Sequence, residues 1–313
     1  SPQGRTQMYV SALVPLGAEV TATEFRTRSI DPVWRNEIRV INGLDLNRPA
    51  WASGDFWAAS LKRQNLYEGF EIAFWAAARV GGAKEIRRNP MELVHYNLEL
   101  AARNIKAAVD AGVDRFCYVS SSYVYPEHGY QGIAEGSLEF ETNAFDVPFQ
   151  HYGLGWIKRF IEKLCKAHQL TSRTKFALVR PAAIYGPYDN FDLESCHVVP
   201  ALIRKVAEHK VRPLEVWGDG SEQRQFTYVD DLATGLLHAT EKYCVAEPIN
   251  IATETVSQVN DIWRTLFDIE GASQLNDSPY GVRYLGDQPT VISRRVINVA
   301  RCKSILQHSC ETS

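Results

Sequence analysis

The sequence predicts an α/β protein, with a doubly wound parallel sheet and a smaller C-terminal lobe. Short apolar runs with strand character alternate along the chain with longer stretches of helical periodicity. This alternation is typical of a parallel sheet covered by helices on both faces. After about residue 187 the pattern becomes less regular and turn-forming stretches appear, which indicates the second lobe. With 313 residues, the chain can hold one large α/β unit or two coupled domains.

The strands and helices follow from the spacing of apolar residues. The apolar runs predicted to be strands are residues 18–25, 37–46, 70–78, 114–122, 175–186 and 214–218. Two long stretches with helical periodicity, 89–112 and 152–169, predict the main helices. A sheet of this class has its first strand at the centre, and we expect that strand to be absent or to lie upstream of Ser1.

The composition describes an ordinary globular chain, with 45% hydrophobic and 23% charged residues. The formal net charge of -3 gives no reason to expect nucleic acid or an anionic membrane as a partner. No apolar run approaches the roughly 18–20 residues that a spanning helix needs. The six cysteines are scattered without a C-x-x-C pair, so we expect no metal site and reduced thiols in a cytoplasmic protein.

Seven stretches, each weak alone, occur in a specific order. They are GLDL (43–46), AAARVGG (76–82), YVSSSYVYP (118–126), RPAAIYGPYDNF (180–191), HVVPALIRK (197–205), VWGDGSEQRQFTYVDDLA (216–233) and INIATETVS (249–257). In these stretches the chain resembles the extended short-chain dehydrogenase/reductase family, the NAD-dependent nucleotide-sugar epimerases and dehydratases. It is most similar to the GDP-fucose synthase and GDP-mannose epimerase branch. The resemblance covers nearly the whole chain, from residue 17 to residue 306.

This resemblance implies a Rossmann-type fold with two functional parts. We expect a dinucleotide-binding domain over residues 1–178 and a substrate lobe mainly over 179–313. Residues 226–255 are expected to return to the first domain. The family also implies a homodimer that forms through the two long helices.

The expected cofactor is NAD or NADP, and the glycine motif that should bind it is altered. A phosphate-binding turn needs glycines so that backbone N–H groups can approach the pyrophosphate. At the expected spacing only Gly4 is a glycine, with Ser1 and Gln7 at the other two positions.

Other residues of the expected cofactor site are better matched. Glu24, at the end of the next strand, is placed to accept a hydrogen bond from a ribose hydroxyl. The alternative is that nearby arginines face a 2′-phosphate, or are surface charges. By resemblance, Asp45 lies beside the adenine, and Ala77 and Ala78 supply a small backbone close to the cofactor.

The catalytic group implied by the family is a serine, a tyrosine and a lysine four residues after the tyrosine. The lysine lowers the tyrosine's pKa and also holds the cofactor ribose, while the serine polarises the substrate oxygen. Ser121 and Lys158 match the serine and the lysine, and Glu162 follows Lys158 as in the family's helix. Leu154 stands where the tyrosine is expected.

A second register keeps the tyrosine and loses the lysine. It uses Tyr152 as the catalytic tyrosine and puts Trp156 in the place of the lysine. In an α-helix, residues two apart point roughly 200° apart, so Tyr152 cannot replace the missing tyrosine at position 154 if both are helical. Gly153 and Gly155 leave the local conformation open.

The expected substrate residues lie in the second half of the chain. By resemblance, Arg224 grips a diphosphate, for which a bidentate guanidinium is suited. His197 matches the acid of the fucose-synthase branch, or is a structural histidine at a helix start. Tyr123 stands where that branch has a cysteine, and Asn190 is expected to contact the substrate. Ala183 replaces an asparagine that the family usually has.

Three functions are compatible with these residues. The first is an epimerase, dehydratase or reductase that acts on a nucleotide-linked hexose with NAD(P). The second is the same scaffold used for isomerase, lyase or aldol-type chemistry without hydride transfer, through Ser121, Lys158, Tyr123 and His197. The third is a non-catalytic regulatory or binding subunit. We expect an enzyme with an atypical active site.

Overall fold

A four-stranded parallel sheet in the order β10-β5-β4-β3 forms the centre of the protein. The computed structural model describes residues 21–24, 39–42, 67–78, 90–125, 152–187, 189–193, 196–209, 213–271, 281–286 and 293–312. The four strands are β3 (Ile72–Trp75), β4 (Arg115–Val119), β5 (Lys175–Pro181) and β10 (Pro248–Ile251). Residues 248–251, far along the chain, therefore lie in the same sheet as strands from its first half.

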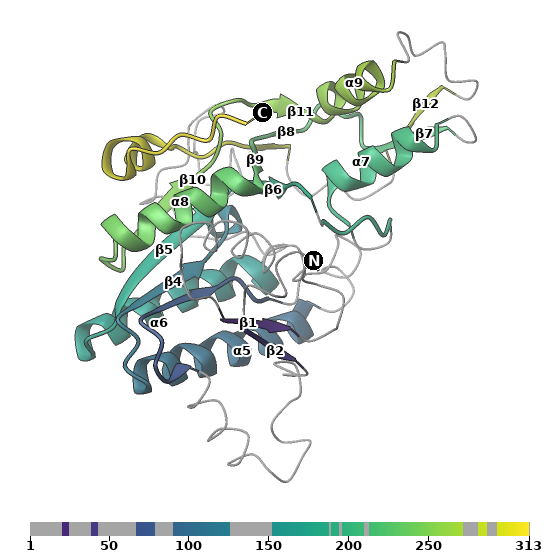
Figure 1. Ribbon diagram of the computed structural model, residues 1–313. Coiled ribbons are helices and arrows are strands. Elements are labelled where there is room, and N and C mark those ends of the chain that lie inside the picture. The colour runs from purple at the N-terminus through teal and green to yellow at the C-terminus, as the bar shows by residue number, and fades with distance from the viewer. Residues whose placement is uncertain are drawn as a thin grey trace.

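The two central strands are buried on both faces, as a parallel sheet covered by helices requires. On β4 and β5, one set of alternating side chains, which includes Cys117 and Val179, packs in the core beneath α8 (Val229–Lys242). The other set, which includes Phe116 and Leu178, packs against α5 (Pro90–Asp110) and α6 (Ile157–Thr171). Two hydrophobic cores thus lie on opposite faces of one sheet (Figure 1).

The predicted long helices are present in the structure. They are α5 (Pro90–Asp110) and α6 (Ile157–Thr171), and a π-helical turn, η5 (Tyr152–Trp156), precedes α6. Figure 1 shows α5 and α6 on one side of the sheet and α8 on the other. The first five residues of the predicted helix 152–169 therefore have a wider winding than an α-helix.

The second lobe has its own core. It contains α7 (Val198–Ala207), α9 (Val259–Ile269) and the paired strands β7 (Leu214–Trp217) and β12 (Val282–Leu285). Trp263 and Phe267 of α9 pack there with Leu202 of α7. Figure 1 shows these elements together at one end of the molecule.

Short strands connect the lobe with the main sheet. β8 (Gln223–Arg224) lies between β11 (Ser257–Gln258) and β13 (Arg294–Arg295), and β6 (Ala183–Tyr185) pairs with β9 (Phe226–Tyr228). Near the N-terminus, β1 (Thr21–Glu24) pairs in parallel with β2 (Arg39–Asn42). The segment Cys302–Leu306 (η7) is a further π-helical turn.

Three of the predicted strands were wrong in extent. Of the predicted strand 70–78, only Ile72–Trp75 (β3) is strand. The predicted strand 175–186 is two strands, because β5 ends at Pro181 and β6 leaves the sheet to pair with β9. The predicted strand 114–122 ends at Val119, since the chain then enters the 3₁₀ turn η2 (Ser122–Val124). The domain boundaries stay a prediction.

In the described part of the chain, no helix has the length and apolar character needed to cross a membrane.

Candidate active site

Ser121 lies where the chain leaves the main sheet. Two residues after the end of β4, it has an extended backbone (φ -163°, ψ 153°) and caps η2. Its Oγ accepts a hydrogen bond of 3.1 Å from the backbone N–H of Tyr123. A hydroxyl that accepts one hydrogen bond still carries a proton that it can donate. The half-buried Ser121 is thus oriented by its own turn, with a donor available for a substrate oxygen.

Lys158 lies at the same end of β4. It is the second residue of α6, and its side chain is buried beside the sheet. Its Nζ donates a 2.6 Å hydrogen bond to the carbonyl of Val119, and lies 4.9 Å from the centre of the Tyr118 ring. The structure therefore brings the predicted lysine and the predicted serine to adjacent positions on one strand end.

The tyrosine beneath Lys158 is not an acid–base group at ordinary pH. Burial, the largest cause, raises the pKa of Tyr118 well above its usual value of 10, and the neighbouring Cys165 and Glu162 add to the rise. Tyr118 therefore keeps its proton. The ammonium of Lys158 rests on the face of a neutral ring, where a cation–π contact stabilises it.

The place of the catalytic tyrosine lies in the π-helical turn η5. Leu154 is half-buried there, and its side chain has no group that can transfer a proton. The backbone of Tyr152 opens the same turn, and its side chain lies outside the described part of the structure. Because η5 is wound as a π-helix, the α-helical angle of about 200° between positions 152 and 154 does not apply.

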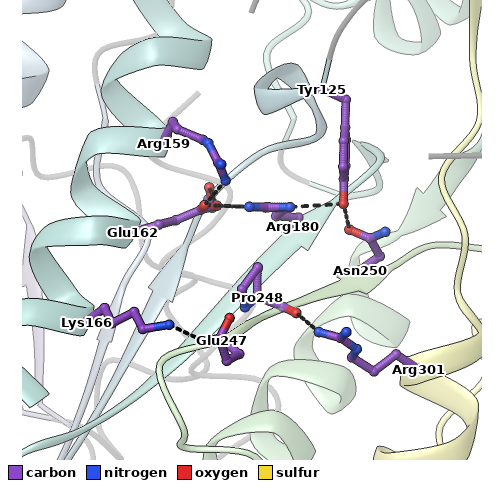
Figure 2. Close-up of polar contacts among 10 residues, drawn as sticks. Tyr125, Arg159, Glu162, Lys166, Arg180, Glu247, Pro248, Asn250 and Arg301 are labelled. Carbon is purple, nitrogen blue, oxygen red and sulfur yellow. Dashed lines mark hydrogen bonds and ion pairs between the residues drawn. The ribbon is translucent and has the colours of Figure 1, made fainter. Parts of the chain in front are cut away.

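Behind the strand end, a buried polar network joins α6 to the sheet (Figure 2). Both carboxylate oxygens of Glu162 accept from the fully buried Arg180, from Nε at 2.8 Å and from Nη2 at 2.6 Å. Ser120 donates to the same carboxylate at 2.5 Å. Tyr125 accepts from Arg180 Nη1 at 3.1 Å and donates to Asn250 at 2.7 Å. We call these five residues the support network.

From the sequence, Glu162 served only to set the register of the helix, and Ser120 was not among the predicted site residues. The structure gives both residues a structural role, because their hydrogen bond connects β4 to α6 behind Ser121 and Lys158. A charged, bidentate pair with satisfied hydrogen bonds holds its partners in one geometry.

A residue that the sequence interpretation missed is Arg295. It extends from β13, is buried, and donates from Nη1 to the carbonyls of Ser122 at 2.7 Å and Tyr125 at 3.1 Å. Its guanidinium carbon lies 5.7 Å from the centre of the Tyr123 ring. Arg295 thus fastens η2 to the second lobe. The only sequence signal is an arginine directly before the apolar pair VI (296–297), which is not specific.

The predicted substrate residues lie on the second-lobe side. Arg224, half-buried on β8, faces Arg295 across the strand pair and donates to the Gln223 carbonyl at 2.9 Å. His197 is exposed and precedes α7. Asn190 is half-buried, and its Oδ1 accepts from the backbone N–H of Asp192 at 3.1 Å. Of these three, Arg224 has the most direct link to the strand end, through its neighbour Arg295.

The predicted cofactor residues are described only in part. Gly4 and Asp45 lie outside the described residues, and so does the side chain of Glu24, whose backbone ends β1. Ala77 and Ala78 follow β3, next to β4, at the sheet edge where Lys158 lies. Ala77 is half-buried and Ala78 is buried. Small side chains at this edge are compatible with a flat ring or a ribose lying close to the backbone.

Comparisons with known proteins give matches over much of this chain. The model of the family described as NAD dependent epimerase/dehydratase matches residues 10–252. A GDP-L-fucose synthase of Sinorhizobium fredii is 35% identical over 181 residues, which are 57% of this chain and 56% of that protein. A GDP-mannose 3,5-epimerase of Arabidopsis thaliana is 30% identical over 204 residues, 65% of this chain and 53% of that protein. The chain thus spans a little over half the length of these curated relatives.

Solved structures agree in fold. The UDP-glucose 4-epimerase of Thermotoga maritima with UDP-glucose has a TM-score of 0.81 at 18% identity, and the match covers 100% of this chain and 93% of that one. A UDP-glucuronic acid 4-epimerase of Bacillus cereus with UDP-glucuronic acid and NAD has a TM-score of 0.76 at 20% identity, covering 99% and 92%. At these identities the similarity shows the fold.

Proposed function

The chain belongs to the NAD dependent epimerase/dehydratase family, and from this premise we propose that it modifies a nucleotide-linked hexose with NAD or NADP. One observation carries the proposal most directly. Ser121 and Lys158, which are 37 positions apart in the sequence, lie at one strand end with a support network behind them. These are two of the three groups that a hydride-transfer site on this scaffold uses, and Leu154 stands in place of the third.

The proposed roles follow from the donors available. The Ser121 hydroxyl donates to the sugar oxygen whose bond changes order, and its turn keeps the Oγ in place. Lys158 offers N–H donors to a cofactor ribose beside Val119. Gly4, Glu24, Asp45, Ala77 and Ala78 are the other proposed cofactor residues. A bound dinucleotide supplies the hydride acceptor or donor at this place.

The second lobe is proposed to hold the nucleotide and to supply a proton. Arg224 binds the diphosphate, supported by its position opposite Arg295. Asn190 contacts the sugar nucleotide. Since Leu154 cannot transfer a proton, the proton comes from Tyr152, Tyr123 or His197, which are the hydroxyl- or imidazole-bearing residues assigned to the site.

The proposed setting of this enzyme is a cytoplasmic homodimer. Exposed apolar side chains on α5, η5 and α6 support the dimer: Met91 is 58% exposed, Trp156 40% and Phe160 51%. Large apolar side chains that gather on one surface are typical of a protein interface. All six cysteines are free thiols, which supports a reducing compartment.

Because Leu154 replaces the expected catalytic tyrosine, it favours a second candidate function, which is chemistry without hydride transfer on the same scaffold. The experiment that separates the two is cofactor binding. The purified protein is denatured and searched for NAD(P) by mass spectrometry, and the stripped protein is titrated with NAD(H) and NADP(H). Saturable binding is the expected result. No binding at millimolar cofactor would end the hydride proposal and leave the second candidate.

Substrate binding is tested separately through Arg224. Arg224→Ala is expected to weaken binding of a nucleotide sugar about 10-fold or more, because a charge-assisted contact to phosphate is lost. Calorimetric titration with GDP- and UDP-hexoses measures the effect. Arg283→Ala is the matched control, since Arg283 lies on β12 of the same lobe. Equal affinity in wild type and Arg224→Ala would remove this assignment.

A further inference from the structure

A cavity separate from the candidate active site lies along the flank of α6. Its volume is about 190 Å³, and it lies between α6, the middle of β5 and the residues that lead into β10. Its charged lining residues are Arg159, Glu162, Lys163, Lys166, Arg180 and Glu247. Figure 2 shows Arg159, Glu162 and Lys166 extending from α6 toward Arg180 and Glu247.

The helical spacing explains why α6 contributes so many of these groups. Residues 159, 162, 163 and 166 are related by three, four and seven positions, so they share one face of the helix. Lys158 is on the neighbouring face and reaches β4. The cavity also borders Ala246 and Pro248 at the start of β10, whereas Ser121 lies past the carboxyl end of β4. The cavity therefore does not include Ser121 or Lys158, although Glu162 and Arg180 of the support network line it.

The lining carries an excess of positive charge. Four cationic side chains, Arg159, Lys163, Lys166 and Arg180, face two carboxylates, Glu162 and Glu247, which gives a formal charge of +2. A cavity wall with this charge attracts an anion, and partial exclusion of water strengthens the attraction.

The carboxylates of the cavity are already engaged. Glu162 uses its oxygens on Arg180 and Ser120, and the Arg159 guanidinium remains 3.8 Å away, too far for a hydrogen bond. Burial, and then the positive charge of Arg180, lower the pKa of Arg159, so the cation lacks full compensation. Glu247 forms an ion pair with Lys166.

Lys163 adds a second cation in need of a counter-charge. Among the contacts of the described residues, it has no hydrogen bond and no ion pair, and its side chain is exposed at the cavity rim. Arg159 and Lys163 are one helical turn apart, so both can approach a single bound group from the same side.

We propose that this cavity binds a phosphate group, with Arg159 and Lys163 as its main ligands and Lys166 at the edge. A guanidinium can contact two phosphate oxygens and an ammonium a third, and a phosphate dianion neutralises the formal excess of +2. The group can be free inorganic phosphate or the phosphate of a sugar phosphate, since both present the same oxygens. Because α6 carries Lys158, occupancy stabilises the helix that holds the active-site lysine.

The test uses the full chain, with inorganic phosphate and a hexose 6-phosphate as probes in chloride buffer of matched ionic strength. Thermal unfolding and calorimetric titration measure the response. Wild type is expected to show a higher Tm and saturable binding with at least one probe. The Arg159→Gln/Lys163→Gln variant is expected to lose about 10-fold or more in affinity. Without phosphate, this variant should unfold at the wild-type Tm, which separates loss of binding from loss of folding.

Two control variants locate the site. Lys303→Gln removes an exposed cation on η7 and should respond as wild type does. Arg224→Ala removes the proposed diphosphate ligand of the other lobe and should also keep its phosphate response. A response lost in Arg224→Ala and kept in the double variant would overturn the proposal, as would equal affinity in all variants or no binding to wild type. Tighter binding of hexose 6-phosphate than of phosphate would identify a phosphorylated metabolite as the source, and the reverse would identify the free ion.

Discussion

The two sides of the β4 strand end differ in how complete they are. On the inner side, the support network satisfies each charged partner with hydrogen bonds of 2.5 to 3.1 Å. On the outer side, Ser121 and Lys158 are in place while a leucine occupies the position of the acid. The residues that support the site and the residues that would react in it are therefore held by different contacts. One can change while the other persists.

The largest expected effect is on the inner side. Arg180→Met leaves the buried Glu162 carboxylate without its guanidinium, which should lower the free energy of unfolding by about 3–5 kcal/mol. Urea unfolding measures it. Lys106→Gln, in the exposed i,i+4 pair with Asp110, is the control and should cost less than about 1 kcal/mol.

A double variant sharpens the same point. Arg180→Met with Glu162→Leu removes both charges and should recover part of the loss, since no uncompensated ion remains in the core. If Arg180→Met alone lowered the free energy of unfolding no more than Lys106→Gln does, the support network would stabilise the protein no more than a surface ion pair.

The next effect is on the outer side. Leu154→Tyr supplies a hydroxyl four residues before Lys158 and is expected to raise kcat about 10-fold or more, because a positioned acid–base group accelerates proton transfer. Steady-state kinetics on the nucleotide sugar that the protein binds provide the measurement. Leu154→Phe, which has the ring and no hydroxyl, should show no gain. An equal rate in both variants would mean that the proton comes from another element.

A third variant addresses the link between the two sides. Arg295→Lys keeps the charge and loses the fork that holds two carbonyls of η2, so kcat should fall about 10–100-fold with little change in KM. Arg294→Lys is the matched control, because Arg294, the neighbour of Arg295 on β13, donates to the Gln223 side chain instead. A change in KM alone would indicate that Arg295 acts on substrate and not on the turn.

The smallest expected effect concerns Tyr118. Its pKa is raised by burial, so the hydroxyl keeps its proton through the pH range in which the enzyme would work. Tyr118→Phe should therefore leave the pH profile of kcat unchanged, because it removes only the hydroxyl and keeps the ring beneath Lys158. A shifted pH profile of kcat would mean that the Tyr118 hydroxyl takes part in proton transfer.

Particular residues show how far the sequence could predict the fold. The alternation of strands and helices predicted the parallel sheet, and the helices at 89–112 and 152–169 were confirmed within a few residues except for the π-helical start. The predicted strand 175–186 was wrong because β6 pairs with β9, a strand about 40 residues away, which no local pattern reveals.

The candidate site divides in the same way. Ser121 and Lys158 could be proposed from the sequence, because Ser121 lies in the stretch YVSSSYVYP and Lys158 stands four residues before Glu162. Arg295 was missed because its partner Ser122 is 173 positions away, and an isolated arginine carries no signal of its contacts. The cavity beside α6 was missed for a similar reason, since it exists only where α6 meets the start of β10.

By itself, the sequence determined which segments become strands and helices, because burial of one face or two leaves a periodic trace in the segment concerned. It also determined which reactive groups the strand ends and helix starts carry. The tertiary structure alone decided which of those groups meet, how η5 is wound before Lys158, and where the cations of α6 outnumber the carboxylates around them. These outcomes depend on the order of strands in the sheet, which places residues far apart in the chain within hydrogen-bond distance.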